Sequence, residues 1–300
     1  MSVTLVIIFN HKYDLNIPLL KEIYGNRFEK VYFIVPFYEG KDEDVISVYE
    51  SSYFFQGYVA QAYRELKKIK SDHILFIGDD LIIDPAIDQN NIYEKVLKGK
   101  KDFYISNMEG LSDNHIWTID RFINARDAFL EDGVAYKKEI PTFEDAYQKA
   151  VDFGIKDFIV KDRNRRFPLY PWKGNIKTNI RIIERSLRES FNIEYPLVYG
   201  YSDIFIVPRN KLETISKYFG VFSAMKLFVE IAIPTAIMLT ADPDKVVMDK
   251  DLDYKNALAW SNFEMITSFS ERCDYNIVKM PDNWPDGYLY MHPIKLSGWK

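Results

Sequence analysis

The sequence predicts an α/β protein whose mostly parallel, Rossmann-like sheet is flanked by helices, with a more helical second half. Two observations predict it. Continuous apolar runs, typical of strands buried on both faces, alternate with amphipathic segments over the first hundred residues. After Asn107 strand signals become rare and helical patterns dominate. Strand–helix–strand units of this kind connect parallel strands by right-handed crossovers.

Each expected element has its own local signal. In residues 16–28, Pro18 falls in the first turn and Gly25 near the end, as in many helices. In residues 53–69, Phe55, Val59, Ala62 and Leu66 form one apolar stripe. Strands are expected at residues 3–9, 30–37, 73–77, 102–106, 203–208 and 288–294. Further helices are expected at residues 143–152, 176–189, 211–218 and 224–239.

Composition narrows the class of protein. The 300 residues are 47% hydrophobic and 28% charged, which supports a sizeable core and argues against wholesale disorder. No linker-like stretch separates the halves, so we expect one domain over residues 1–300, with halves at 1–110 and 111–300. A net charge of −5 argues against general nucleic-acid binding. The single cysteine, Cys273, excludes an internal disulfide and a Cys-rich zinc site.

The sequence carries no recognisable targeting signal, so we expect a cytoplasmic protein. The longest apolar stretch, residues 219–241, contains Lys226, Glu230 and Pro234. Because ionised groups are costly at bilayer depth, we interpret it as buried helix and not as a membrane span.

Adjacent carboxylates, Asp79 and Asp80, follow the apolar run of the third strand. Open α/β sheets bind ligands at the carboxyl ends of their strands. Two neighbouring carboxylates repel each other, and a hard divalent cation would neutralise them. The alternative is a surface turn with two solvated aspartates. The apolar run at residues 81–83 favours the functional interpretation, because it keeps the segment near the sheet.

These features resemble the GT-A fold of nucleotide-sugar-dependent glycosyltransferases, of the kind that build bacterial polysaccharides and glycans. The resemblance rests on a first strand ending in the polar cluster FNHKYD, on the alternating units and on the Asp pair. It implies that residues 1–110 bind the nucleotide-sugar and residues 111–300 the acceptor. In that family an acidic motif holds Mn²⁺ or Mg²⁺ against the donor diphosphate. Here the motif is GDD, which leaves open whether Asp79 or Asp80 is the direct ligand.

The C-terminal sequence MHPIKLS extends the resemblance. Several GT-A families end with a His that completes the metal site, followed by a cation for the diphosphate, which implies these roles for His292 and Lys295. Imidazole suits Mn²⁺, and Lys is a compact charge for phosphate. Taken alone, the segment could equally be an edge strand with one His. The Asp pair favours the metal site.

The resemblance also implies donor contacts after the first strand, where Phe9, Asn10, His11 and Tyr13 would meet the base and ribose. The alternative is a polar loop with one buried Phe. In the second half, Asp203 precedes a strand, and the resemblance implies that it meets sugar hydroxyls. Its alternative role is capping.

Glu230 is an acid within an apolar stretch, so it needs a partner, a raised pKa or a place in a cleft. The resemblance implies that it is the base toward the acceptor hydroxyl in an inverting enzyme. The alternative is a helical ion pair with Lys226.

Residues 161–190 hold nine Lys or Arg against three acids, a local charge of +6. This segment could meet anionic lipid at the inner membrane surface or a phosphate-bearing acceptor, or it could be a solvated face. The whole pattern predicts a metal-dependent glycosyltransferase that acts on a glycan or lipid-linked glycan. Two alternatives remain: a nucleotidyl- or phosphotransferase using the Asp pair with Mg²⁺, and a catalytically inactive nucleotide-sugar- or glycan-binding protein.

Overall fold

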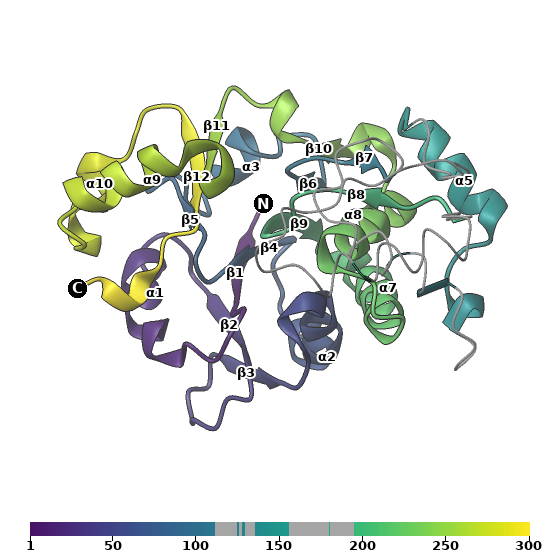
Figure 1. The fold of residues 1–300 in the computed structure, drawn as a ribbon, viewed down its shortest axis with the longest axis horizontal. Helices are drawn as coiled ribbons and strands as arrows, with labels where there is room; N and C mark the ends of the chain where they lie inside the picture. Colours follow the sequence, from purple (N-terminus) through teal and green to yellow (C-terminus); the bar gives the residue numbers. More distant parts are fainter. Residues whose placement is uncertain (112–124, 126–127, 130–135, 156–179, 181–194) are drawn as a thin grey trace.

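A seven-stranded sheet forms the centre of the computed structural model, which describes residues 1–111, 125, 128–129, 136–155, 180 and 195–300 (Figure 1). The strand order is β10-β6-β9-β4-β1-β2-β3. The strands span β1 Val3–Ile8, β2 Val31–Pro36, β3 Val45–Val48, β4 His73–Gly78, β6 Phe103–Ile105, β9 Ile204–Pro208 and β10 Val246–Val247.

The sheet is mostly parallel, as predicted. β1 runs parallel to β2 and β4, β2 to β3, and β10 to β6. β9 is antiparallel to both of its neighbours, β4 and β6. The parallel strands therefore end at one common edge, where β1 and β4 deliver the residues that follow Ile8 and Gly78.

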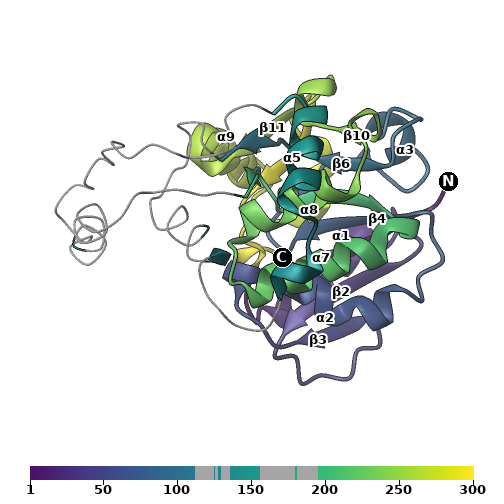
Figure 2. The same cartoon turned by 90° about the vertical axis from the view of Figure 1, so that its right-hand side faces the viewer.

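Helices cover both faces because successive strand residues point to opposite sides. Val6 and Phe76 join a core with α2, α7 and α8, whereas Leu5 and Leu75 join a second core with α1 and α9. Helices α2 and α7 lie side by side (Figure 2). The helices span α1 Ile17–Tyr24, α2 Gln56–Leu66, α3 Ile92–Lys95, α5 Phe143–Asp152, α7 Leu212–Ala224, α8 Val229–Thr240, α9 Ala259–Arg272 and α10 Met280–Asn283.

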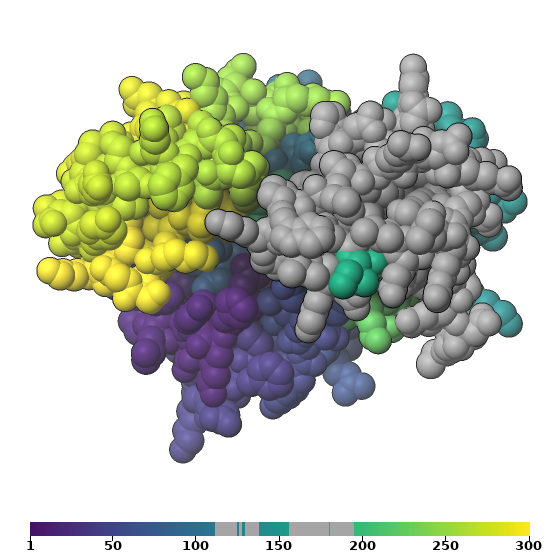
Figure 3. Space-filling model, viewed as in Figure 1, coloured from purple at the N-terminus to yellow at the C-terminus, as the bar shows by residue number. Residues whose placement is uncertain are grey.

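A three-stranded sheet, ordered β11-β12-β5, connects the end of the chain to the Asp pair. β5 (Ile82–Ile83) follows Asp80 almost directly and is antiparallel to β12 (Tyr288–His292), which is parallel to β11 (Lys255–Leu258). The C-terminal segment therefore lies against the N-terminal part of the molecule (Figure 3). A two-stranded ladder joins β7 (Glu109–Gly110) to β8 (Val198–Tyr199).

The expected helix over residues 224–239 is wrong in its boundaries. The chain is helical to Ala224, turns through Lys226 with a left-handed φ of 56°, and begins α8 only at Val229. The C-terminal strand ends at His292, before Pro293, which has no N–H to extend a ladder. The expected helix at 176–189 lies outside the described residues. Within the described part of the chain, no helix is long and apolar enough to cross a membrane.

Candidate active site

Asp79 and Asp80 are held at the edge where the parallel strands end. Both are buried, with 4% and 7% of their surface exposed. The backbone N–H of Asp79 donates to the carbonyl of Ile8, which continues the β1–β4 ladder by one residue. Its Oδ1 accepts from the backbone N–H of Asn10 at 3.1 Å. The strand geometry thus fixes one carboxylate against the loop after β1, and the turn directs the next toward the C-terminal segment.

The C-terminal segment reaches Asp80 through its backbone and two side chains. The N–H of Ile294 donates to the Asp80 carbonyl at 2.7 Å. His292 Nε2 lies 3.2 Å from Asp80 Oδ1, and the Lys295 ammonium contacts Asp80 Oδ2. Asp80 Oδ1 is buried without an aligned hydrogen bond in the described structure. The structure therefore brings His292 and Lys295 together with Asp80, across more than two hundred residues of chain.

Electrostatics distinguishes the two aspartates. Burial, and then the charge of Asp80, raise the pKa of Asp79 to about 7. Burial also opposes ionisation of Asp80, but the contacts with His292 and Lys295 prevail and hold its pKa at about 2. Burial lowers the pKa of His292, but Asp80 and Asp203 outweigh it, so the net shift is upward. Asp80 is therefore the permanent anion of the cluster, whereas Asp79 takes up a proton near neutral pH.

Asp203 lies on the other side of the same imidazole. It directly precedes β9, and its Oδ2 lies 3.7 Å from His292 Nε2. Its carbonyl accepts from the N–H of Gly78 at 2.8 Å, which connects it to the end of β4. Burial raises the pKa of Asp203, and the charge of Asp80 adds to the rise while His292 opposes it. The structure thus brings Asp203 into the cluster.

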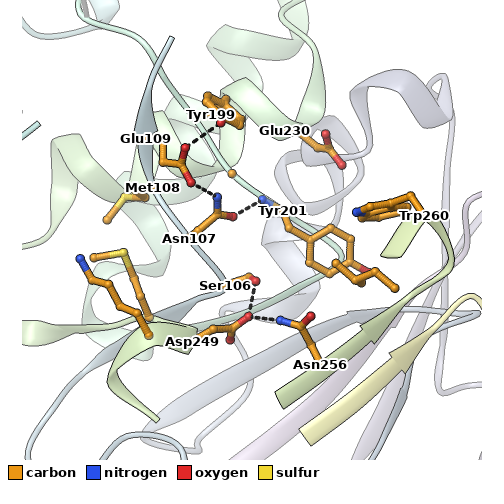
Figure 4. A pocket seen from close by; sticks show the side chains of 14 residues that line it. Ser106, Asn107, Met108, Glu109, Tyr199, Tyr201, Glu230, Asp249, Asn256 and Trp260 are labelled. Carbon is orange, nitrogen blue, oxygen red and sulfur yellow. Dashed lines mark hydrogen bonds between the residues drawn. The ribbon is translucent and has the colours of Figure 1, made fainter. Parts of the chain in front are cut away.

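A pocket of about 960 Å³ adjoins this cluster (Figure 4). Tyr201 and Trp260 line the pocket, and their rings lie 5.6 Å and 6.1 Å from the His292 ring, centroid to centroid. Tyr201 also stacks on Tyr290 of β12, with ring planes 9° apart. Two aromatic side chains therefore contact both the polar cluster and the pocket.

Glu230 lines the same pocket. It lies in the first turn of α8, not in mid-helix as expected, and its backbone carbonyl accepts from the N–H of Gly200. Lys226 lies in the turn before the helix, so Lys226 and Glu230 do not have the i,i+4 spacing on one helix that the alternative interpretation required.

The expectation for the loop after β1 is corrected at Phe9. Its ring is fully buried and packs edge-on against Phe33, 6.2 Å between centroids, so it offers no face to a base. His11 and Tyr13 are exposed, with their rings 5.6 Å apart. Asn10 uses its backbone N–H to hold Asp79.

Several pocket residues were not predicted from the sequence. Asp249 follows Val246, Val247 and Met248, an apolar run ending in an acid as at Asp79, but too short to indicate a strand by itself. Tyr201 and Trp260 have no local signal, because their role depends on contacts with His292. The basic segment 161–190 lies outside the described residues, except for Ile180.

The described residues form no cluster of three or more His, Cys, Asp or Glu side chains arranged to hold a metal ion. Any cation at Asp80 and His292 would therefore complete its coordination with ligand and water oxygens, which is common for Mg²⁺ at phosphate sites.

Several solved structures are similar to this chain, and two of them are described here, while no family model and no curated protein matches the sequence. The first is core-mannan synthase A from Aspergillus fumigatus in its Mn/GDP form, with 11% identity, 84% of this chain and 73% of that chain covered, and a TM-score of 0.38. The second is the mannosyltransferase Ktr4p from S. cerevisiae in complex with GDP, with 12% identity, coverage of 83% and 70%, and a TM-score of 0.35.

Proposed function

We propose that this protein is a metal-dependent, GT-A-type glycosyltransferase that moves a sugar from a nucleoside diphosphate donor to a hydroxyl of a glycan. One observation carries the proposal. Asp80, His292 and Lys295 converge at the carboxyl edge of the parallel strands, directly beside a large pocket. This is where open α/β sheets bind ligands, and the cluster combines ligands for a cation with a charge for a phosphate.

The residues of the cluster fit Mn²⁺ or Mg²⁺. Asp80 Oδ1 is a buried carboxylate oxygen without an aligned hydrogen bond among the described residues, and an imidazole nitrogen faces it at 3.2 Å. Oxygen and imidazole donors suit these cations, Mn²⁺ in particular. Asp79 would be a second carboxylate once it loses its proton. When bound, the metal would stabilise the negative charge that develops on the leaving diphosphate.

Different side chains around the cluster are proposed to bind different parts of the nucleotide-sugar donor. Lys295 is exposed on one side and contacts Asp80 on the other, which suits it to a diphosphate oxygen. Asn10, His11 and Tyr13 are proposed for the base and ribose, now without Phe9. Asp203, beside His292, is proposed to bind hydroxyls of the transferred sugar.

In the proposed transfer, Glu230 is the base that takes the proton of the acceptor hydroxyl. The acceptor oxygen forms a bond to the anomeric carbon while the bond from that carbon to the diphosphate oxygen breaks. The electron pair leaves on the diphosphate, and the acceptor hydroxyl proton passes to the Glu230 carboxylate. This direct displacement inverts the anomeric centre. Support for Glu230 comes from its place in the pocket lining, at the first turn of α8.

The same Asp pair would serve a nucleotidyltransferase, and an inactive binding protein could retain the pocket. A thermal-shift screen separates these functions. We expect nucleoside diphosphates to raise the melting temperature only together with Mn²⁺ or Mg²⁺, by mass action on the folded state. A preference for triphosphates would favour nucleotidyl transfer. Metal-dependent diphosphate binding without release of sugar from any nucleotide-sugar would favour the inactive protein.

A bacterial polysaccharide pathway, a cytoplasmic location and membrane contact through residues 161–190 remain predictions. Release of free nucleoside diphosphate from a panel of nucleotide-sugars, followed with and without Mn²⁺, identifies the donor. Absence of any metal-dependent release, with each purified nucleotide-sugar tested, would contradict the transferase.

A further inference from the structure

The pocket beside the cluster contains a carboxylate that neutral groups hold in place. Glu109 Oε1 accepts from the Asn107 amide at 3.0 Å, and Glu109 Oε2 accepts from the Tyr199 hydroxyl at 2.7 Å (Figure 4). Asn107 is itself fixed, because its Oδ1 accepts from the backbone N–H of Tyr201 at 2.8 Å. These donors orient Glu109 without cancelling its charge.

Asp249 repeats this arrangement on the opposite side of the pocket. The Asn256 amide donates to its Oδ2 at 2.6 Å, and the Tyr290 hydroxyl at 3.0 Å. Ser106 and Tyr104 also donate to this carboxylate through their hydroxyls. All four donors are neutral, and two come from β6 and its end while the others come from β11 and β12. The second carboxylate is thus built into the junction of the two sheets.

The charge balance of the described lining is acidic. Glu109 and Asp249, both held by neutral donors, line the pocket, and Lys250 is the single basic residue in the described part of the lining. An anionic group of a ligand placed among these carboxylates would meet like charges at short range, which costs several kcal/mol in binding free energy. A hydroxyl or an ammonium would instead donate to a carboxylate oxygen.

An aromatic surface completes the pocket. Trp260 is 66% exposed although its ring contacts Tyr201 and His292. An exposed indole at the mouth of a pocket provides an apolar face, and oriented carboxylates and amides inside provide hydrogen-bond acceptors and donors. This combination matches a sugar ring, which has an apolar face and a rim of hydroxyls.

We propose that this pocket selects sugar rings by charge: it binds neutral or amino-bearing rings and rejects rings that carry a carboxylate, sulfate or phosphate. The selection rests on the proposed transferase function and defines its substrate class. The ring could belong to the acceptor or to the donor's transferred sugar, and the two sources are distinguished below.

The test for the acceptor is a glycan array probed with the full-length protein without nucleotide or metal. The array carries neutral, amino-sugar, uronic-acid, sialylated, sulfated and phosphorylated glycans. We expect binding to neutral or amino-sugar termini, weaker by about tenfold or more for the same glycan with an acidic terminal ring. Equal or stronger binding of acidic termini would overturn the proposal.

The test for the donor compares nucleotide-sugars with their bare nucleoside diphosphates in the presence of Mn²⁺. We expect UDP-glucose, GDP-mannose or another neutral nucleotide-sugar to bind at least as tightly as the bare diphosphate, and UDP-glucuronate to bind about tenfold more weakly than UDP-glucose. If no arrayed glycan binds and no neutral sugar is distinguished from its uronate, the proposal fails.

Two substitutions tie the result to the pocket. Glu109→Gln keeps the shape of the side chain and one acceptor oxygen but removes its charge, so the ratio of neutral-ring to acidic-ring binding should fall several-fold. Trp260→Ala should weaken the binding of neutral sugar rings by about fivefold or more, because the indole face is lost. Phe143→Ala, which removes an exposed aromatic side chain of α5 that is not part of the described pocket lining, is the matched control. Unchanged discrimination in folded Glu109→Gln would overturn the proposal.

Failure of this proposal is distinct from failure of the proposed function. Asp80→Asn removes a proposed metal ligand but leaves the pocket lining intact, so it should lose metal-dependent diphosphate binding and keep glycan binding. If the wild type binds diphosphate with metal but does not distinguish neutral from acidic sugar rings, the proposal on the pocket is wrong and the proposed transferase function is unaffected.

Discussion

The Asp79–Asp80 cluster and the adjoining pocket use the same residue type in opposite electrostatic settings. In the cluster, the carboxylate of Asp80 is buried and contacts an imidazole and an ammonium. In the pocket, Glu109 and Asp249 are held by amides and hydroxyls. In the functions that we propose, the first setting would hold a cation and phosphate oxygens, and the second would direct negative charge at hydroxyl groups. The partners of a carboxylate, more than its presence, indicate its role.

The comparison also explains why the two regions lie side by side. The glycosyl transfer that we propose requires a charged leaving group and neutral hydroxyls within one site, at positions that differ in charge. Tyr201 contributes to both, since it lines the pocket and packs against His292.

Asp80→Asn should have the largest effect, because it removes the anion that His292 and Lys295 contact. We expect metal-dependent binding of nucleoside diphosphate to fall by about 100-fold or more, beyond the loss usual for outer-shell residues. Calorimetric titration of diphosphate with Mn²⁺ measures the loss. Asp286→Asn, at an exposed position, is the matched control. Full metal-dependent binding by the Asp80 variant would remove the cation site from the cluster.

Glu230→Gln should separate chemistry from binding. The amide keeps the shape of the side chain but cannot accept the acceptor proton, so turnover should fall by about 10²- to 10⁴-fold. Metal-dependent binding of the diphosphate should not change, since Glu230 lies in the pocket and not in the cluster. Turnover of a nucleotide-sugar with its acceptor and the thermal shift with diphosphate measure the two properties. Full turnover in this variant would exclude Glu230 as the base.

Strands of the first half that are buried and read as continuous apolar runs were predictable, whereas the partly buried β3 was missed. β1, β2 and β4 begin and end within one or two residues of the predicted ranges. β10 and β11 were missed since they are short and pair only through distant residues. The antiparallel direction of β9 was also not predictable, because residues 203–208 show the same apolar pattern in either direction.

The cluster was predictable only because its residues carry a motif, whereas the pocket has none. Asp79, Asp80 and His292 stand in recognisable local sequences, and their convergence depends on β12 pairing with β5. Phe9 shows the opposite case. Its sequence position beside a polar loop suggested a ligand contact, but the side-chain alternation along β1 directs it into the core beside Phe33.

The pH dependence of metal-free protein should differ between wild type and Asp79→Asn. Burial, and then Asp80, raise the pKa of Asp79 from 3.8 to about 7. Because the folded protein binds a proton at Asp79 more tightly than the unfolded chain does, protonation stabilises the folded state. This contribution is fully present below about pH 4 and is lost as the pH rises through about 7. The stability of the wild type relative to the variant should therefore fall by a few kcal/mol between about pH 5 and pH 8, at ~1.4 kcal/mol per pKa unit.

Urea unfolding in the presence of EDTA measures this difference. Asn at position 79 can still accept from the N–H of Asn10, so the variant isolates the titration. Mn²⁺ with diphosphate should reverse the trend in the wild type, because the cation competes with the proton. A relative stability that is flat with pH would show that Asp79 is ionised throughout and that the two aspartates do not differ as described.

Tyr290→Phe should have the smallest effect and tests whether the two regions are separable. It removes one of four donors to Asp249 but keeps the ring that stacks on Tyr201. We expect a loss of about 1 kcal/mol in unfolding free energy, typical of one hydrogen bond. Metal-dependent diphosphate binding should remain within about twofold, since the ring contact, not the hydroxyl, reaches His292 through Tyr201. A large loss of that binding would instead mean that the hydroxyl network around Asp249 positions the strand carrying His292, and the pocket and the cluster would then be one cooperative unit.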